Sequence, residues 1–270
     1  MKLTLVSTPI GNLGDITLRA IESLKLSDLV ICEDTRVTKS LCQKLGIELK
    51  GQIISFNDHS DAKIPSLIKK IKASAFAVLV SDAGSPIISD PALPLIKACL
   101  DEDIIVDSNP GASSVVMALE LSGLPSSPFT FHGFLSRTKG EIEKSLLHTS
   151  SLGGTHIYFE SPHRIHQTVT LMKKSLPQAQ VAICRELSKK FQSVYRGYVE
   201  ELRLEDIEAK GEFAIVLYEE TKKTALSSDV KGLVDKFLDK STDKNLSKLL
   251  AALSDKKSKE IYEILLSRRS

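Results

Sequence analysis

The feature that most constrains the fold is a short apolar strand that runs directly into a turn rich in proline and glycine. Leu3–Val6 has the apolar content of a buried strand, and the turn 8–17 follows it with the sequence TPIGNLGDIT. The arrangement recurs where the apolar segment 78–80 meets the turn 81–86, SDAGSP. Such turns bring bare backbone to the carboxyl edge of an open α/β sheet, where these sheets bind their ligands. Two of them in one chain predict one ligand held between them.

Strand and helix patterns alternate along the first part of the chain, which predicts a mostly parallel sheet covered by helices on both faces. We expect strands at Leu3–Val6, Leu29–Cys32, Ile53–Ser55, Ala77–Val80 and Ile104–Asp107, and helices at Ile16–Leu26, Thr35–Leu45, Ala62–Ala73, Pro91–Leu100 and Ser113–Leu121. The run SGLPSSP at 122–128 breaks this alternation and predicts a domain boundary.

A second α/β unit follows this boundary. We expect its strands at Phe129–Phe134, His156–Phe159, Val181–Cys184, Ser193–Val199 and Glu212–Tyr218, and its helices at Gly140–Leu147 and Ile165–Leu176. Because Ser193–Val199 lies close behind Val181–Cys184, part of this sheet is expected to be antiparallel. Helical spacing marks the end of the chain, at Leu246, Leu249, Leu250, Leu253, Ile261, Ile264 and Leu265.

The predicted fold is therefore α/β with two domains and a tail. An N-terminal domain with a mostly parallel sheet is expected over 1–122, and a second domain with a mixed sheet over 123–222 completes a ligand cleft. A small helical appendage is expected over 228–270.

Composition excludes several classes of protein. The 270 residues carry a formal net charge of only +2, so a nucleic-acid partner has to be argued from local clusters. No window approaches the ~18 consecutive apolar residues of a membrane helix, and Met1 and Lys2 lead directly into a strand, which predicts no signal peptide. The four cysteines are far apart, so we expect neither disulfides nor zinc and favour a reducing cytoplasm. The chain lacks G-x-G-x-x-G and Walker motifs, which argues against a conventionally bound dinucleotide or triphosphate.

Polar side chains follow the strands of the first domain at the same predicted edge. Glu33, Asp34 and Arg36 end the second strand. Helix capping would account for Asp34, but it does not account for the two charges that flank it. Asp82 stands in the second turn, where a plain tight turn is the alternative. The segment 109–114, NPGASS, forms a third turn of small residues. Its serines could simply cap the next helix, but three such turns at one edge favour a ligand cradle.

Basic side chains follow the strands of the second domain in the same way. They are Arg137, Lys139, His163, Arg164, Arg185, Lys189 and Lys190. Each of them alone is most simply a solvated surface charge. Their recurrence at strand ends favours contact with a polyanion, positioned through its phosphates.

Six motifs in this order resemble the tetrapyrrole methylase superfamily, and within it the ribosomal RNA small subunit methyltransferase I family. They are TPIGNL with DIT at 8–17, EDTR at 33–36, SDAGSP with SDP at 81–91, GFL at 133–135, ESPHR at 160–164 and REL at 185–187. The resemblance covers almost the whole chain. It implies S-adenosylmethionine between two domains and methylation of a cytidine ribose 2′-hydroxyl in 16S rRNA, free or within the 30S subunit. It also implies a homodimer and a tail that helps to dock RNA.

The resemblance assigns roles to residues of this sequence. The implied cofactor contacts are Pro9, Gly11, Asp82, Gly84, Ser85, Ser113, Ser114, Phe159 and Ala214. With rRNA as the polyanion, the expected RNA contacts are Arg36, Arg137, His163, Arg164, Arg185, Lys189 and Lys190. The chain departs from the family pattern at Phe191–Ser193, where an acidic residue is usual, and this weakens a catalytic role for that loop.

Methyl transfer to a ribose hydroxyl requires an oxygen aligned with the sulfonium carbon and the removal of a proton. No metal is needed, and the sequence has no ligand cluster for one. Glu33, Asp34 or Glu160 is the hypothesised proton acceptor, and the sequence does not choose among them. One alternative is a tetrapyrrole or other small-molecule methylase of the same fold, against which the basic loops argue. Another is a non-catalytic RNA-binding module, against which the two intact turns argue.

Overall fold

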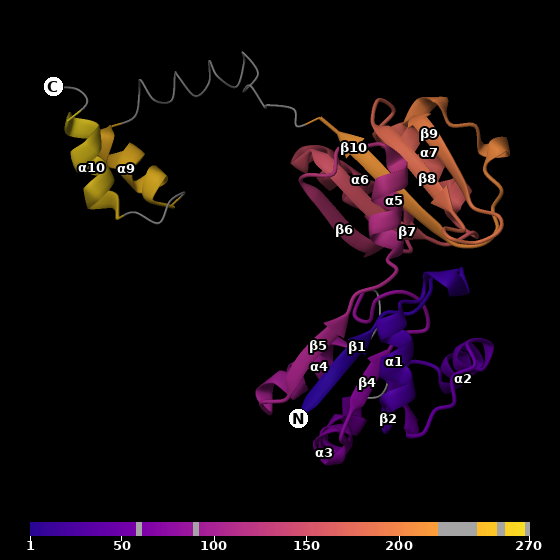
Figure 1. Cartoon of the computed structure of the whole chain (residues 1–270). Coiled ribbons are helices and arrows are strands. Elements are labelled where there is room, and N and C mark those ends of the chain that lie inside the picture. Colours follow the sequence, from indigo (N-terminus) through magenta and orange to yellow (C-terminus); the bar gives the residue numbers. More distant parts are fainter. Residues whose placement is uncertain (58–60, 89–91, 221–241, 253–256, 268–270) are drawn as a thin grey trace. The chain divides into compact units, whose positions relative to one another are not determined.

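The computed structural model describes residues 1–57, 61–88, 92–220, 242–252 and 257–267. The chain divides into two compact units, residues 1–221 and 222–270. The first unit contains two five-stranded sheets, each built from consecutive parts of the chain (Figure 1). The predicted α/β class with two sheets is thus confirmed.

All strands of the first sheet are parallel. They are β1 (Lys2–Val6), β2 (Leu29–Cys32), β3 (Gln52–Ser55), β4 (Ala77–Val80) and β5 (Ile105–Asn109), in the spatial order β3-β2-β4-β1-β5. The intervening helices are α1 (Leu18–Leu26), α2 (Thr35–Lys44), α3 (Ile64–Ala73) and α4 (Leu93–Asp101). Strands β2 and β4 are buried along their whole length, as expected for parallel strands with helices on both faces.

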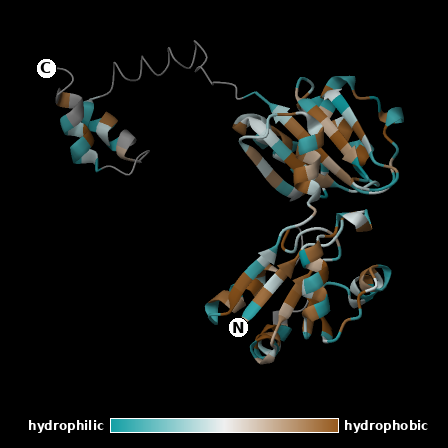
Figure 2. Cartoon of the chain, viewed as in Figure 1, coloured by the Kyte–Doolittle hydropathy of each residue, from teal (hydrophilic) through white to brown (hydrophobic). Residues whose placement is uncertain are grey.

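Successive residues of these strands alternate between two cores, one on each face of the sheet. Leu79 of β4 packs with Leu67 of α3 and Leu95 of α4. Its neighbour Val78 points to the opposite face and packs with Leu24 of α1. In Figure 2 the helices carry both hydrophobic and hydrophilic residues, as helices that cover one side of a sheet should.

The second sheet is mixed, as predicted. Its strands are β6 (Phe129–Phe134), β7 (Gly154–Glu160), β8 (Gln180–Arg185), β9 (Ser193–Tyr198) and β10 (Phe213–Glu219), in the order β6-β7-β10-β8-β9. Only β6 and β7 pair in parallel, whereas β10 runs antiparallel to both β7 and β8, and β9 antiparallel to β8. The helices that follow β6 and β7 are α6 (Lys139–Leu152) and α7 (Ile165–Ser175).

Helix α5 (Ser114–Ser122) follows β5 of the first sheet but packs against the second sheet. Its buried residues Ala118 and Leu119 share a core with Ala182 of β8 and Val216 of β10. In Figure 1 the helix accordingly lies along these two strands. The domain limits at 122 and 222 stay a prediction, and the structure adds that the chain reaches the second sheet already at α5.

Most element boundaries differ from the predicted ones by one or two residues, with α6 as the main exception. The predicted helix ends at Leu147, ahead of the polar segment HTSS at 148–151. The helix continues to Leu152, since Thr149 is buried and its hydroxyl lies within hydrogen-bond reach of Tyr158 on β7. A buried partner on the sheet thus outweighs the weak helix propensity of these residues.

The second unit contains α9 (Asp243–Ala252) and α10 (Ser258–Ser267), which pack against each other. Leu246 and Ile261, whose spacing predicted helices, are buried. The predicted positions 228–241 and Leu253 lie outside the described residues, as does the predicted start of α4 at Pro91. No helix in the described ranges is long and apolar enough to cross a membrane.

Candidate functional site

The turns that follow β1, β2, β4 and β5 lie at one edge of the first sheet, because these strands are parallel. The first two turns singled out in the sequence are joined by backbone hydrogen bonds: Thr8 N donates to Gly84 O at 2.8 Å, and Gly84 N to Thr8 O at 3.1 Å. The Ser81 hydroxyl donates to Gly84 O as well, at 2.9 Å. Gly84 has φ +80°, a conformation that glycine adopts without strain.

A cavity of about 440 Å³ opens at this edge and is shared by the two sheets. The first half of the unit contributes Ile10, Glu33, Asp82, Ala83, Ile88 and Ser114. The second half contributes Phe134, Phe159, Glu160, Ser161, Pro162, Leu187, Gly211, Glu212, Phe213 and Ala214. Its volume lies within the usual range of small-molecule sites.

Apart from Ser114 and Ser161, the lining of this cavity is apolar or acidic, and among the residues that the structure describes it includes no lysine, arginine or histidine. Phe134 and Phe159 form an aromatic corner, with their ring centroids 5.5 Å apart. Carboxylates come from both sheets, for example from Asp82 and Glu160. Burial raises the pKa of the Asp82 carboxyl above its ordinary value, although the Asp34 backbone N–H donates to it at 3.1 Å. Such a lining suits a ligand with flat apolar parts and a positive charge.

Four of the nine predicted cofactor contacts line the cavity, namely Asp82, Ser114, Phe159 and Ala214. The other five are Pro9, Gly11, Gly84, Ser85 and Ser113, which are not among its lining residues. Ser113 caps α5, since its hydroxyl accepts from Val116 N. Gly11 lies against the loop after β8, because a Cβ there would stand 2.9 Å from Leu187 O and clash with Lys189.

The three candidate proton acceptors differ in their surroundings. Glu33 lines the cavity. Asp34 instead forms a two-pronged pair with Arg36, with Nη2 and Oδ2 2.6 Å apart, and these hydrogen bonds lower the pKa of its carboxyl to about 2. Glu160 lines the cavity but is fully buried: it pairs with Arg164 at 2.6 Å and accepts from Ser161 N and the Thr168 hydroxyl.

The predicted RNA contacts fall into two groups. Arg36, Arg137, His163 and Lys190 are exposed. The remaining three have their charged groups engaged within the protein. Arg185 is buried and bonds Glu208, Lys210 O and Phe191 O, and the Lys189 ammonium pairs with Glu186 and Glu212 at 2.9 and 3.0 Å. Arg164 bonds Leu135 O and Ser136 O in addition to Glu160.

Sequence reasoning missed the contribution of the segment Gly211–Phe213 at the start of β10. Because β10 is antiparallel to β7 and β8, its first residue Phe213 pairs with their last residues, Glu160 and Arg185. The start of one strand thus meets the ends of two others at the site. Gly211 and Glu212, a small and a polar residue, precede the apolar run of β10 and were a signal in the sequence. Only the direction of β10 shows that this signal belongs to the site.

The family model described as Tetrapyrrole (Corrin/Porphyrin) Methylases matches residues 2–203 of the chain. The chain is 37% identical over 264 residues to a protein of Rickettsia prowazekii named ribosomal RNA small subunit methyltransferase I, covering 96% of this chain and 92% of the relative. A protein of the same name from Halalkalibacterium halodurans is 42% identical over 218 residues, which cover 80% of this chain and 75% of the relative.

Solved structures share the fold at low identity. A diphthine synthase superimposes with a TM-score of 0.62 at 17% identity, over 81% of this chain and 90% of that one. A uroporphyrin-III C-methyl transferase from Thermus thermophilus, complexed with S-adenyl homocysteine, superimposes with a TM-score of 0.55 at 17% identity, over 81% and 98% of the two chains.

Proposed function

The chain belongs to the tetrapyrrole methylase family and, within it, to the ribosomal RNA small subunit methyltransferase I family, and from that premise we propose that it methylates a cytidine ribose 2′-hydroxyl in 16S rRNA with S-adenosylmethionine. The observation that carries this function is the apolar and acidic cavity where the ends of both sheets meet. The substrate follows from the relatives, which are similar over up to 96% of the chain.

The residues that line the cavity fit S-adenosylmethionine. Its adenine is flat and apolar, and its sulfonium and amino groups are positive. The aromatic corner at Phe159 and the small residue Ala214 would hold the adenine, and Asp82 and Ser114 would bind its hydroxyl and amino groups. When bound, the cofactor supplies an electrophilic methyl carbon. The protein aligns the ribose oxygen with this carbon, and such positioning accounts for much of the acceleration of a displacement.

Glu33 is the residue that we assign to the proton of the ribose hydroxyl. Asp34 is a weak base, since its pKa is about 2 and its oxygens are occupied by Arg36. Glu160 accepts hydrogen bonds from the protein on both of its oxygens. Glu33 lines the cavity from the end of β2 and is only partly buried, whereas the Glu160 side chain is fully buried and paired with Arg164. Its carboxylate would orient the 2′-hydroxyl and take up its proton as the new C–O bond forms.

RNA would be held by the exposed basic residues Arg36, Arg137, His163 and Lys190. Arg164, Arg185 and Lys189 would act indirectly, because their bonds fix the loops that follow β7 and β8. We also propose that the protein is a homodimer and that it acts on ribosomal RNA in the cytoplasm. Analytical ultracentrifugation tests the oligomeric state of the protein.

The function is tested by transfer of labelled methyl groups from S-adenosylmethionine to 30S subunits and to free 16S rRNA. Cleavage that is sensitive to ribose methylation then maps the product. We expect incorporation at one cytidine ribose, and the two substrates show which assembly state is accepted. Tight cofactor binding by calorimetry without transfer to either RNA would contradict the rRNA substrate and indicate a small-molecule methylase.

The assignment of Glu33 is tested by Glu33→Gln, which keeps the shape of the side chain and removes its basicity. A general base typically contributes ~10²–10⁴-fold, so kcat should fall by about this factor. The dissociation constant for S-adenosylmethionine should stay unchanged. Asp34→Asn is the matched comparison on the next residue and should reduce kcat far less. A kcat of Glu33→Gln close to wild type would show that another group takes the proton.

A further inference from the structure

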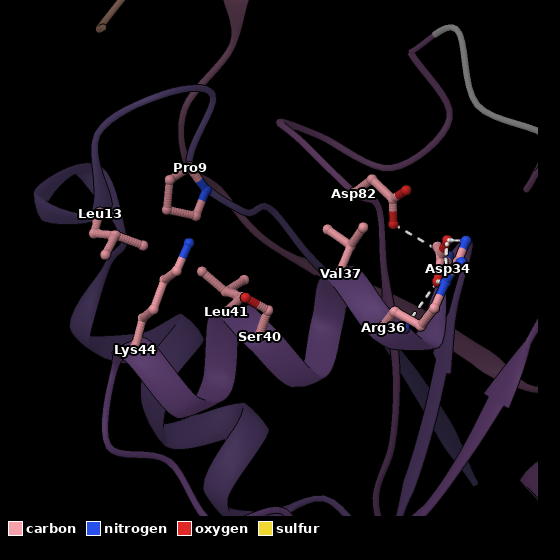
Figure 3. A pocket seen from close by; sticks show the side chains of 9 residues that line it. All are labelled: Pro9, Leu13, Asp34, Arg36, Val37, Ser40, Leu41, Lys44 and Asp82. Atoms are coloured by element: carbon pink, nitrogen blue, oxygen red, sulfur yellow. Dashed lines mark hydrogen bonds and ion pairs between the residues drawn. The ribbon is translucent and has the colours of Figure 1, made fainter. Parts of the chain in front are cut away.

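A second hollow of about 530 Å³ lies beside the cofactor cavity, between α2 and the turn after β1. Its apolar lining is Pro9, Leu13, Val37 and Leu41. Ser40 and Lys44 of α2 and the charged residues Asp34, Arg36 and Asp82 complete it. In Figure 3 the side chains of Leu13, Leu41 and Lys44 converge on one space below Pro9. Val37 and Leu13 are each 40% exposed, so this hollow is open to solvent.

The two hollows share a wall. Asp82 lines both of them. At the turn after β1, Pro9 lines the second hollow and Ile10 the cofactor cavity. At the end of β2, Asp34 lines the second hollow and Glu33 the cofactor cavity. Consecutive residues thus face opposite spaces, and a molecule in the second hollow lies directly next to the cofactor.

The charged side chains of the second hollow are two acidic and two basic ones, Asp34, Asp82, Arg36 and Lys44, and of these Asp34 and Arg36 pair with each other. The Arg36 guanidinium is held by Asp34 through bonds from Nε and Nη2, so its charge is balanced and its plane is fixed. Its side chain is nevertheless 89% exposed. The Lys44 ammonium makes no hydrogen bond or ion pair within the part of the chain that the structure describes. Figure 3 shows it directed into the hollow, toward Pro9.

We propose that this second hollow binds the nucleotide next to the methylated cytidine, with Lys44 on its phosphate and the apolar lining against its base or sugar. The inference rests on the proposed function, because an RNA whose ribose reaches the cofactor must place a neighbouring nucleotide beside that cavity. Single-stranded RNA is recognised through splayed nucleotides that lie on apolar or guanidinium surfaces. The fixed guanidinium plane of Arg36 offers such a surface at the rim, and Ser40 adds a hydroxyl for hydrogen bonding.

Lys44→Met is the decisive variant, because it keeps the apolar stem and removes the charge. Binding to 30S subunits, with S-adenosylhomocysteine present, should weaken about tenfold, as for the loss of one charge-assisted hydrogen bond. The logarithmic dependence of affinity on salt should become shallower by about 0.7, the value for one single-strand phosphate contact. The dissociation constant for S-adenosylmethionine and the melting temperature should match the wild type. Lys44→Arg should restore most of the affinity.

Lys39→Met is the matched control, since Lys39 is an exposed lysine on the same helix that does not line this hollow. Wild-type 30S affinity and salt dependence in Lys44→Met would overturn the second-hollow proposal while leaving the methyltransferase function intact. An equal loss in Lys39→Met would also overturn it, because a general basic surface would then explain the effect. Weaker S-adenosylmethionine binding in Lys44→Met would assign the hollow to the cofactor instead. A wild-type chain that methylates no ribose would refute the function and, with it, this inference.

Discussion

At the scale of single residues, charge at the site serves the fold as well as the chemistry. The carboxylate of Glu160 is 0% exposed, and its partner Arg164 is 22% exposed. The guanidinium of Arg164 also binds Leu135 O and Ser136 O after β6. The pair therefore fastens the end of β7 to the end of β6, next to the cavity. The motif ESPHR at 160–164 predicted a functional site, and from the contacts of Glu160 we propose that this side chain acts as a positioning residue.

Glu160→Ala should lower the free energy of unfolding by about 3 kcal/mol, because removing one partner of a buried pair leaves a buried charge uncompensated. Urea denaturation measures this change. Lys174→Met serves as the control, since its ion pair with Glu143 is on the surface and should change the free energy by less than about 1 kcal/mol. If Glu160→Ala reduced kcat and left the unfolding free energy unchanged, Glu160 would have a catalytic rather than a positioning role.

Gly11→Ala should loosen the contact between the turn after β1 and the loop after β8. A Cβ at Gly11 would lie 2.9 Å from Leu187 O, so backbone has to shift. Overpacking of this kind costs about 1–3 kcal/mol, and Leu187 lines the cavity, so affinity for S-adenosylmethionine should fall as well. Calorimetry and thermal denaturation measure the two effects. Gly140→Ala is the control, because nothing lies within 4 Å of the added Cβ, and it should leave both properties unimpaired.

At the scale of elements, the strands and helices of the first sheet were predictable because their signals are local. Leu29–Cys32 and Ala77–Val80 are short continuous apolar runs with β-branched residues, which favours strands over helices, and both are strands within these bounds. The length of α6 depends on its contact with β7, and the direction of β10 depends on its pairing with β7 and β8. For this reason some cavity residues after strands, such as Glu33 and Asp82, were predicted, whereas Gly211–Phe213 at the start of β10 were not.

The second sheet contains a titrating pair that the chemistry does not use. His132 of β6 and His156 of β7 share a hydrogen bond of 2.9 Å, and His132 stacks on Tyr158 with ring centroids 4.5 Å apart. Burial lowers the pKa of both imidazoles below the ordinary value, and for His132 the neighbouring His156 lowers it further. The unfolded chain therefore binds protons at a higher pH than the folded chain does.

The contribution of this histidine pair to the free energy of unfolding is present above the pKa of histidine in the unfolded chain, about 6.5, and is lost as the pH falls below that value. The free energy of unfolding should accordingly decrease between pH 7 and pH 5.5. His132→Phe retains the stacking on Tyr158 and removes one titrating group, so its decrease should be shallower. Equal slopes in wild type and His132→Phe would exclude the pair as the cause.

At the scale of the whole molecule, the described residues that line the two hollows belong to the unit 1–221. The second unit, 222–270, has its own small core between α9 and α10. Its helical character could be predicted from the spacing of leucines and isoleucines. Spacing within one helix does not show which other part of the protein the helix packs against. The two units can therefore be separated experimentally.

A chain that ends at residue 221 should bind S-adenosylmethionine with the affinity of the full chain, because it retains all the described residues that line the cavity. Its affinity for 30S subunits should be lower, in line with the RNA-docking role that the family resemblance implies for the tail. Calorimetry and a 30S binding assay measure the two quantities on both chains. Equal 30S affinities would show that the tail does not contribute to docking.

The wall between the two hollows has a consequence for protein engineering. Pro9 and Ile10, like Glu33 and Asp34, are adjacent residues that face opposite spaces. A substitution at Pro9 or Ile10 that shifts their shared backbone would alter both spaces, so substrate and cofactor preference would change together. Redesign of substrate choice alone should instead target Leu13, Ser40 and Lys44, which line the second hollow and not the cofactor cavity. The turns at this wall would then stay unchanged, and RNA specificity could be altered by substitutions in α2.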